Sequence, residues 1–162
     1  MAASARIGHG YDVHAFAPGS GFVLGGVSID CDKSVVAHSD GDVLIHALCD
    51  ALLGALGRGD IGRLFADTDP GNRDRDSREF LRELRDLLSR DGYRLANADI
   101  TVIAQAPTIA PHVAAMRECL ADDLGCAVAA LNIKATTTEK LGFIGRQEGI
   151  AAEAVVLLET DS

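Results

Sequence analysis

The sequence lacks several features that would place it in familiar classes of protein. No apolar run approaches the ~20 residues that a membrane-spanning helix requires, and there is no internal repeat or low-complexity segment. Positive charge is not in excess, because 15 Lys and Arg stand against 24 Asp and Glu and give a net charge of −9. A protein that binds nucleic acid through its phosphates normally carries the opposite balance. We therefore expect neither a membrane nor a nucleic-acid partner.

Cysteine occurs without a recognisable pairing pattern. Cys31, Cys49, Cys119 and Cys126 show no Cys-x-x-Cys spacing, and two of them fall in helical patterns, where a thiol behaves as a small hydrophobe. This favours a reducing compartment. The segment Met1–Ala5 is too short to hold a signal peptide, so we expect a cytoplasmic location.

The length of 162 residues predicts a single domain over 1–162. Hydrophobic periodicity and turn residues predict, in order, a strand at Arg6–Phe16, a β-hairpin at 22–29 around Gly25-Gly26, a helix at Asp42–Leu56, a loop at Gly59–Asp76, a helix from Asp76 to Gly92, a strand at Asp99–Gln105, a helix at Pro111–Leu124, and strands at Leu131–Ala135 and Ala151–Leu158. This order implies an α+β or mixed α/β layer, with helices packed on a mixed sheet.

Three side chains form a candidate metal site. Asp12 and His14 are two residues apart on a predicted strand, so they project from the same face. His46 lies on the first predicted helix, which must pack against the sheet. An Asp/His/His set would give zinc three protein ligands and leave one position open for water or substrate. The alternative is that His46 is a hydrogen-bonded core histidine.

Small polar residues precede this helix and form a candidate anion site. His38 and Ser39 lie close to the predicted N-terminus of the helix, where backbone N–H groups attract anions. The alternative is that Ser39 or Asp40 is only the helix cap.

The segment 134–146 carries a third candidate site. Thr136, Thr137 and Thr138 offer hydroxyl groups, and Glu139 is a hard oxygen ligand suited to magnesium. Positive charge in this segment comes from Lys134, Lys140 and Arg146, which we expect to gather around an anionic ligand together with divalent cations. The alternative is that the threonines only favour strand and turn structure.

Five separated motifs together resemble one known family, that of 2-C-methyl-D-erythritol 2,4-cyclodiphosphate synthase. They are Gly8-His9-Gly10-Tyr11-Asp12-Val13-His14, the segment Ala37–His46, Gly59-Asp60-Ile61-Gly62 followed by Phe65-Ala66-Asp67-Thr68-Asp69-Pro70, Ala104-Gln105-Ala106-Pro107, and the segment Lys134–Arg146. The resemblance runs from Arg6 to about Leu158. Five motifs in the right order make accidental similarity improbable, although each alone is a weak signal.

The resemblance implies a reaction and a set of metals. Members of the family cyclise 4-diphosphocytidyl-2-C-methyl-D-erythritol 2-phosphate to the 2,4-cyclodiphosphate and release CMP. By this resemblance Asp12, His14 and His46 hold zinc, Glu139 contributes to a magnesium or manganese site, and His38 and Thr137 orient phosphate and stabilise the transition state.

The resemblance also implies which residues contact substrate. It assigns the methylerythritol end to Asp60, Ile61, Gly62, Phe65, Ala66, Asp67, Thr68 and Asp69, and the cytosine pocket to Ala104, Gln105, Ala106, Pro107, Thr108, Ile109 and Ala110. The other residues expected to contact substrate are Asp12, His14, His38, Ser39, Thr136, Thr137, Thr138, Glu139, Phe143 and Arg146.

Family members are homotrimers around a threefold axis with active sites between subunits, so the same assembly is expected here. Gly142, Phe143, Arg146 and Glu148 resemble residues that line a central cavity, in which some members bind isoprenoid diphosphates. The sequence leaves open whether this chain does so.

Two other functions remain open on the sequence. A zinc-dependent phosphohydrolase would use the same three ligands but activate a water molecule in the fourth position. A trimeric nucleotide-binding protein without catalysis would use the metal only for structure.

Overall fold

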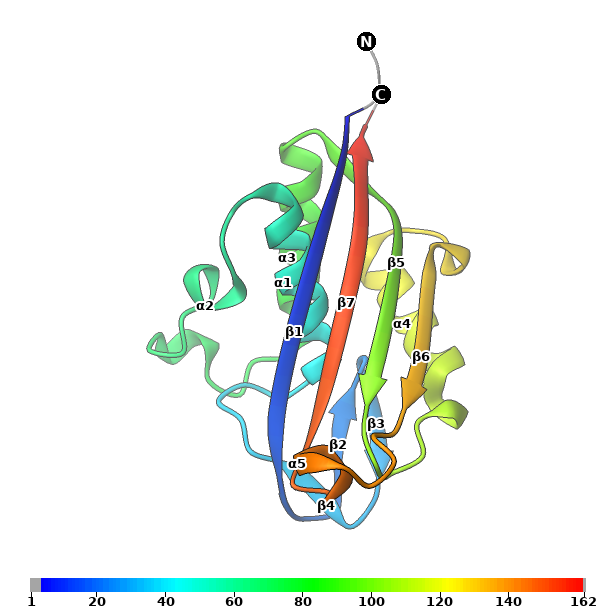
Figure 1. Cartoon of the computed structure of the whole chain (residues 1–162). Helices are drawn as coiled ribbons and strands as arrows, with labels where there is room; N and C mark the ends of the chain where they lie inside the picture. The colour runs from blue at the N-terminus through cyan, green and yellow to red at the C-terminus, as the bar shows by residue number, and fades with distance from the viewer. Residues whose placement is uncertain (1–3, 162) are drawn as a thin grey trace.

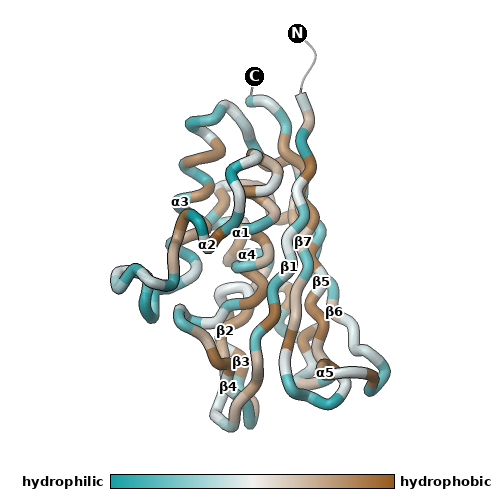
Figure 2. Tube along the Cα trace, turned by 60° about the vertical axis from the view of Figure 1, so that its left-hand side comes forward, coloured by the Kyte–Doolittle hydropathy of each residue, from teal (hydrophilic) through white to brown (hydrophobic). Residues whose placement is uncertain are grey.

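The computed structural model describes residues 4–161 as helices packed on one face of a mixed β-sheet. Residues 1–3 lie outside the described range. They belong to the segment Met1–Ala5, which we predicted to be too short for a signal peptide. The main sheet has the strand order β4-β1-β7-β5-β6, with β5 and β6 parallel and the other neighbours antiparallel. Figures 1 and 2 place α1, α3 and α4 on the same side of this sheet. The α+β, mixed-layer prediction is confirmed.

The predicted elements occur in the predicted order with different boundaries, together with short elements that the sequence did not predict. The strands are β1 (Ala5–Pro18), β2 (Gly21–Leu24), β3 (Val27–Asp30), β4 (Lys33–Val35), β5 (Tyr93–Ile103), β6 (Leu131–Thr136) and β7 (Gly149–Thr160). The helices are α1 (Val43–Leu56), α2 (Ile61–Leu64), α3 (Ser77–Arg90), α4 (Val113–Leu124) and α5 (Gly142–Gly145), and 3₁₀ turns are η1 (Pro70–Asn72), η2 (Ala110–His112) and η3 (Val128–Ala130). Within residues 4–161 no helix is both long enough and apolar enough to span a membrane.

Three of the differences from the sequence prediction have identifiable local reasons. β5 begins at Tyr93, whereas the sequence predicted a strand from Asp99. The sequence pattern missed the first part because a bulge between Leu95 and Asn97 interrupts the alternation that marks a strand. Pro111 lies in the 3₁₀ turn η2, which precedes α4. The predicted loop between α1 and α3 contains α2 and η1, each too short to show a periodic pattern.

Asp42 is the N-cap of α1, so the alternative in which Ser39 or Asp40 caps this helix is wrong. One carboxylate oxygen of Asp42 accepts the Ile45 N–H at 3.0 Å and the Gly25 N–H at 2.9 Å, and the other accepts the Gly26 N–H at 2.8 Å. Both glycines have positive φ, as the predicted hairpin turn requires. Burial raises the pKa of Asp42, although the three N–H donors oppose that shift. The carboxylate thus fastens the β2–β3 hairpin to the start of α1.

Candidate active site

The strand β1 and the helix α1 approach each other unusually closely. A Cβ atom at Gly8 would lie 1.8 Å from the carbonyl oxygen of Ala51, and one at Gly10 would lie 1.9 Å from that of Ala47. Only glycine on the strand leaves room for the helix backbone at this separation. The close approach brings the side chain of His46 on α1 over Asp12 and His14 on β1.

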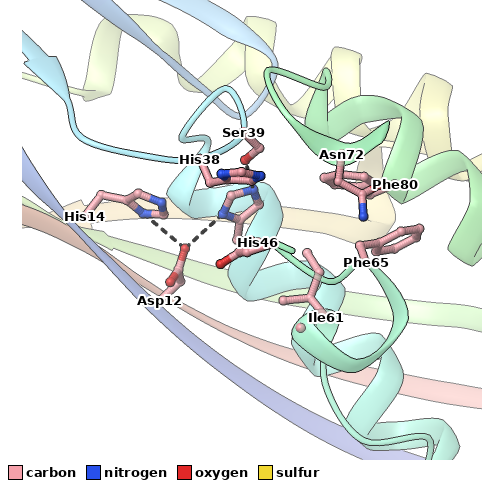
Figure 3. Close-up of a pocket in the computed structure, with 11 residues that line it drawn as sticks. Asp12, His14, His38, Ser39, His46, Ile61, Phe65, Asn72 and Phe80 are labelled. Carbon is pink, nitrogen blue, oxygen red and sulfur yellow. Dashed lines mark hydrogen bonds and ion pairs between the residues drawn. The ribbon is translucent and has the colours of Figure 1, made fainter. Parts of the chain in front are cut away.

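Asp12, His14 and His46 form one cluster at this contact (Figure 3). Oδ2 of Asp12 lies 3.2 Å from Nδ1 of His14 and 3.1 Å from Nδ1 of His46. The three potential ligand atoms all lie within 4.8 Å of one another, and within residues 4–161 this is the one cluster of three or more His, Cys, Asp or Glu residues close enough to share a metal ion.

The electrostatics of the cluster favour an ionised carboxylate. Burial opposes the ionisation of Asp12, but its close contacts with His14 and His46 and their charge attraction outweigh burial and lower the pKa of Asp12 to about 2. Burial likewise opposes protonation of His46, and the contact with Asp12 outweighs it and raises the pKa of that imidazole. The arrangement is suited to holding positive charge next to Asp12.

The residues of the cluster fit a divalent metal ion. Nδ1 of His14 is buried without a hydrogen-bond partner although it points toward Asp12, which is expected of a ligand atom that awaits a metal. Two imidazole nitrogens and one carboxylate oxygen match the ligand types of a catalytic zinc site. Glu139 lies outside this cluster, so a magnesium ion at Glu139 would need further ligands from a bound molecule.

The cluster opens into a cavity of about 190 Å³. Its lining residues are Asp12, His14, His38, Ser39, His46, Ile61, Gly62, Phe65, Asp67, Asn72 and Phe80. The rings of Phe65 and Phe80 stack with centroids 4.3 Å apart, and the guanidinium of Arg75 lies over both. The side of the cavity opposite the metal cluster thus carries two stacked aromatic rings beside the polar side chain of Asn72.

The two aspartates that flank His46 on its helix have structural contacts. Asp42 is the cap described above, and Oδ1 of Asp50 accepts the Ile61 N–H at 2.7 Å. Burial raises the pKa of Asp50, the backbone contact opposing it. Asp50 thus fixes the start of the segment 61–69 relative to α1.

The predicted sugar-binding segment divides in the structure. Ile61, Gly62, Phe65 and Asp67 line the cavity. Asp60 caps α2 through the Arg63 N–H, and Asp69 caps η1 through the Gly71 N–H. The remaining predicted residues of this segment, Ala66 and Thr68, are not among the lining residues.

A second group of predicted residues lies at the ends of β5 and β6 and does not line this cavity. Here the Ala104 N–H donates to the carbonyl of Thr136 at 3.0 Å, and the Lys140 N–H donates to Oε1 of Gln105 at 3.0 Å. The hydroxyl of Thr137 accepts the Glu139 N–H at 3.1 Å. The segments 104–110 and 136–140 therefore form one local unit, separate from the metal cluster.

Two of the three cations in the segment 134–146 have acidic partners within the chain. Nζ of Lys134 pairs with Asp99, and the guanidinium of Arg146 pairs with Glu148 at 2.9 Å. Both pairs are exposed. Spacing in the sequence could not show the first pair, because Asp99 is on the neighbouring strand.

Asn72, Phe80 and Ser77 belong to the site but were not predicted from the sequence. Asn72 and Phe80 line the cavity, and Oγ of Ser77 lies 2.9 Å from Nε2 of His46. Asn72 and Ser77 are polar and buried, but burial is not visible in the sequence. Phe80 belongs to the apolar stripe of α3, a pattern that indicates burial but not which residues the ring faces.

The chain is similar over almost its whole length to proteins of a single family. The model of the YgbB family matches residues 5–159. The 2-C-methyl-D-erythritol 2,4-cyclodiphosphate synthase of Thioalkalivibrio sulfidiphilus is 64% identical over 98% of this chain and 99% of its own length.

Solved structures agree in fold over almost the whole chain. The IspF of Plasmodium falciparum in complex with CDP has a TM-score of 0.87 and 36% identity over 98% of both chains. The bifunctional IspDF of Campylobacter jejuni has a TM-score of 0.94 and 44% identity, and this protein spans 43% of that longer chain. The chain described here belongs to the YgbB family, the family of the 2-C-methyl-D-erythritol 2,4-cyclodiphosphate synthases.

Proposed function

We propose that this protein converts 4-diphosphocytidyl-2-C-methyl-D-erythritol 2-phosphate to 2-C-methyl-D-erythritol 2,4-cyclodiphosphate and releases CMP. The observation that carries the proposal is the cluster of Asp12, His14 and His46 at the wall of a cavity. The family of the chain and the CDP complex of a relative support a cytidine nucleotide as the ligand.

The reaction requires the protein to position the substrate and does not require a covalent intermediate on the protein. An oxygen of the 2-phosphate forms a bond to the β-phosphorus, the bond from this phosphorus to the bridging oxygen breaks, and CMP leaves with that oxygen. No protein nucleophile is needed, since the attacking group belongs to the substrate. The protein must bring two anionic phosphates together and stabilise the charge of the transition state.

We assign the metal sites to residues on both halves of the site. Asp12, His14 and His46 would hold zinc, and Glu139 would contribute a carboxylate to magnesium or manganese. When bound, these cations neutralise phosphate charge and act as Lewis acids. The ionised Asp12 at the contact of β1 and α1 keeps the imidazoles turned toward the common ligand position.

Other groups would orient the substrate. His38 and Ser39 line the cavity beside the metal cluster and are suited to bind a phosphate there. Ile61, Gly62, Phe65 and Asp67 would hold the methylerythritol end, with the Asp67 carboxylate accepting hydrogen bonds from its hydroxyl groups. Thr136, Thr137 and Thr138 would contact the diphosphate, and the segment 104–110 would hold the cytosine.

We propose a homotrimer in which neighbouring subunits share each active site. Within one chain the metal cluster and the segments 104–110 and 136–140 form separate groups, so a second chain would have to join them. The sheet face opposite the helices also exposes apolar side chains, with Ile7 at 76%, Val155 at 50% and Tyr11 at 45% of full exposure. Patches of this kind are typical of association surfaces.

The four free thiols support the expected cytoplasmic location.

Product analysis in ¹⁸O-labelled water tests the proposed reaction. The protein, zinc and magnesium are incubated with the substrate, and products are identified by phosphorus NMR and mass spectrometry. We expect CMP and an unlabelled cyclic diphosphate. An open-chain product that contains ¹⁸O would instead indicate a phosphohydrolase, and binding of CDP without turnover would indicate a nucleotide-binding protein.

A further inference from the structure

The side of His46 that faces away from Asp12 is held by a second set of polar contacts. Nδ1 of His46 faces Oδ2 of Asp12 at 3.1 Å, while Nε2 lies 2.9 Å from Oγ of Ser77 and 3.1 Å from Oγ of Ser39. Ser77 is the first residue of α3 and is fully buried. Both ring nitrogens of His46 are therefore engaged, and from opposite directions.

Asp40 decides how the hydroxyl of Ser77 is oriented. One carboxylate oxygen of Asp40 accepts the Ser77 N–H at 2.8 Å, and the other contacts the Ser77 hydroxyl. A hydroxyl has one proton to donate, and an ionised carboxylate can only accept. The Ser77 proton therefore points to Asp40, which leaves a lone pair of Oγ facing His46.

This orientation requires Nε2 of His46 to be a donor. An N–H group on Nε2 would donate to Ser77, whereas an unprotonated Nε2 would face a lone pair. With a proton held on Nε2, Nδ1 donates to Asp12 while the imidazole is charged, and it offers its lone pair to a metal ion once the imidazole is neutral. Nδ1 is the nitrogen that faces Asp12 and His14.

We propose that Ser77, oriented by Asp40, is a positioning residue that keeps the proton on Nε2 of His46 and so commits Nδ1 to the metal ion. The inference rests on the metal site assigned above to Asp12, His14 and His46. A partner on the second ring nitrogen fixes the tautomer and orientation of a metal-binding histidine and raises its basicity. Here the partner comes from α3, so the start of this helix becomes part of the metal centre.

Ser39 contacts the same nitrogen but lacks the second contact that would orient it. Its oxygen is at the longer distance of 3.1 Å, and its side chain is half-buried on the segment before α1. The Ser77 side chain is held by a helix, a backbone N–H and a carboxylate. The geometry therefore assigns the positioning role to Ser77 and leaves the Ser39 hydroxyl free to turn toward the cavity.

Zinc affinity tests the proposal without reference to turnover. The wild-type protein, Ser77→Ala and Asp40→Asn compete for zinc with a chromophoric chelator, with Ser89→Ala as the matched control, since Ser89 is an exposed serine of the same helix. We expect Ser77→Ala to bind zinc about 10–100-fold more weakly and Ser89→Ala to match the wild type. Asp40→Asn should also bind more weakly, because the amide can donate to Ser77 and turn its hydroxyl toward His46.

NMR spectroscopy can detect the proton on Nε2 of His46 directly. In ¹⁵N-labelled, zinc-loaded protein, the wild type and Ser89→Ala should show a slowly exchanging Nε2–H signal of His46. Ser77→Ala should lose this signal to fast exchange with solvent, while its melting temperature confirms that the fold is retained. Asp40→Asn keeps the Ser77 side chain and gives an independent reading if Ser77→Ala folds poorly.

Two results separate the failure of this inference from that of the metal site. Zinc affinity of Ser77→Ala within about twofold of the wild type, together with an unchanged Nε2–H signal, would overturn the positioning role while the metal site stands. A wild-type protein that binds zinc no more tightly than His46→Ala would overturn the metal site itself, and the inference with it.

Discussion

The two halves of the proposed active site are built in opposite ways. The metal cluster lies at the contact of β1 and α1, where its side chains are largely buried and contact one another within one chain. The segments 104–110 and 136–140 lie at the ends of β5 and β6, and Thr137, Glu139 and Lys140 are exposed. Glu139 and Lys140 also have positive φ values of 54° and 66°. One half is complete in a single chain, and the other presents its groups outward, as a surface that completes a neighbour's site would.

The largest effect should follow removal of a ligand from the buried half. We expect His46→Ala to lose zinc and to lower kcat/KM about 1,000-fold or more, because metal stabilisation of several kcal/mol corresponds to this factor. Metal analysis and steady-state kinetics measure the two losses. His112→Ala, a histidine outside the cavity, is the control. Full activity of metal-free His46→Ala would contradict the assigned role.

The exposed half should respond differently. We expect Thr137→Ala to lower kcat about 100-fold, as removal of one transition-state donor does, while zinc content and melting temperature stay at wild-type values. Thr137→Ser keeps the hydroxyl and should retain most activity. A parallel loss of zinc in Thr137→Ala would show that the two halves are not independent.

Close packing of β1 on α1 should make the buried half intolerant of a single methyl group. Gly10→Ala would place its Cβ against the carbonyl oxygen of Ala47, so we expect the free energy of unfolding to fall by about 3 kcal/mol. Gly54→Ala is the matched control on α1, since its nearest neighbour would lie 3.8 Å away and alanine favours helix by about 1 kcal/mol. Chemical denaturation measures both. Equal effects would contradict the packing argument.

The smallest effect concerns charge within the metal-free cluster. The pKa of Asp12 lies at about 2 in the folded protein against an ordinary 3.8, so ionised Asp12 contributes stability that is present above pH 3.8 and is lost as the pH falls toward 2. After allowance for partial exposure, Asp12→Asn should lower the free energy of unfolding by about 1–2 kcal/mol at pH 5. Denaturation of metal-free protein should show this difference shrink between pH 4 and 2. A difference independent of pH would contradict the charge argument.

The sequence predicted those parts of the fold that depend on neighbours in the chain. Gly57 and Gly125 end α1 and α4 in the left-handed conformation, and Asp76 caps α3, as the local pattern indicates. The strand β4, at the edge of the sheet, was missed because three residues show no period. The sequence also offered Asp40 as a cap of α1. In the folded chain Asp40 instead contacts the start of α3, which is distant in the sequence.

The candidate site shows the same division between local and distant information. Strand alternation correctly placed Asp12 and His14 on one face, and the helix pattern placed His46 toward the sheet. The roles of Asp50, Ser77 and Asp99 depend on partners 11 to 37 residues away in the chain. No pattern of spacing encodes such contacts, which the folded backbone creates.

The most direct test asks whether two defective chains restore each other's activity. Differently tagged His46→Ala and Thr137→Ala chains are expressed together, mixed trimers are purified through both tags, and turnover is measured. If each site joins the metal cluster of one chain to Thr137 of its neighbour, about one third of the sites in a mixed trimer combine two intact halves, and we expect activity at about that fraction of wild type. Activity no higher than that of the single variants would contradict a site shared between subunits.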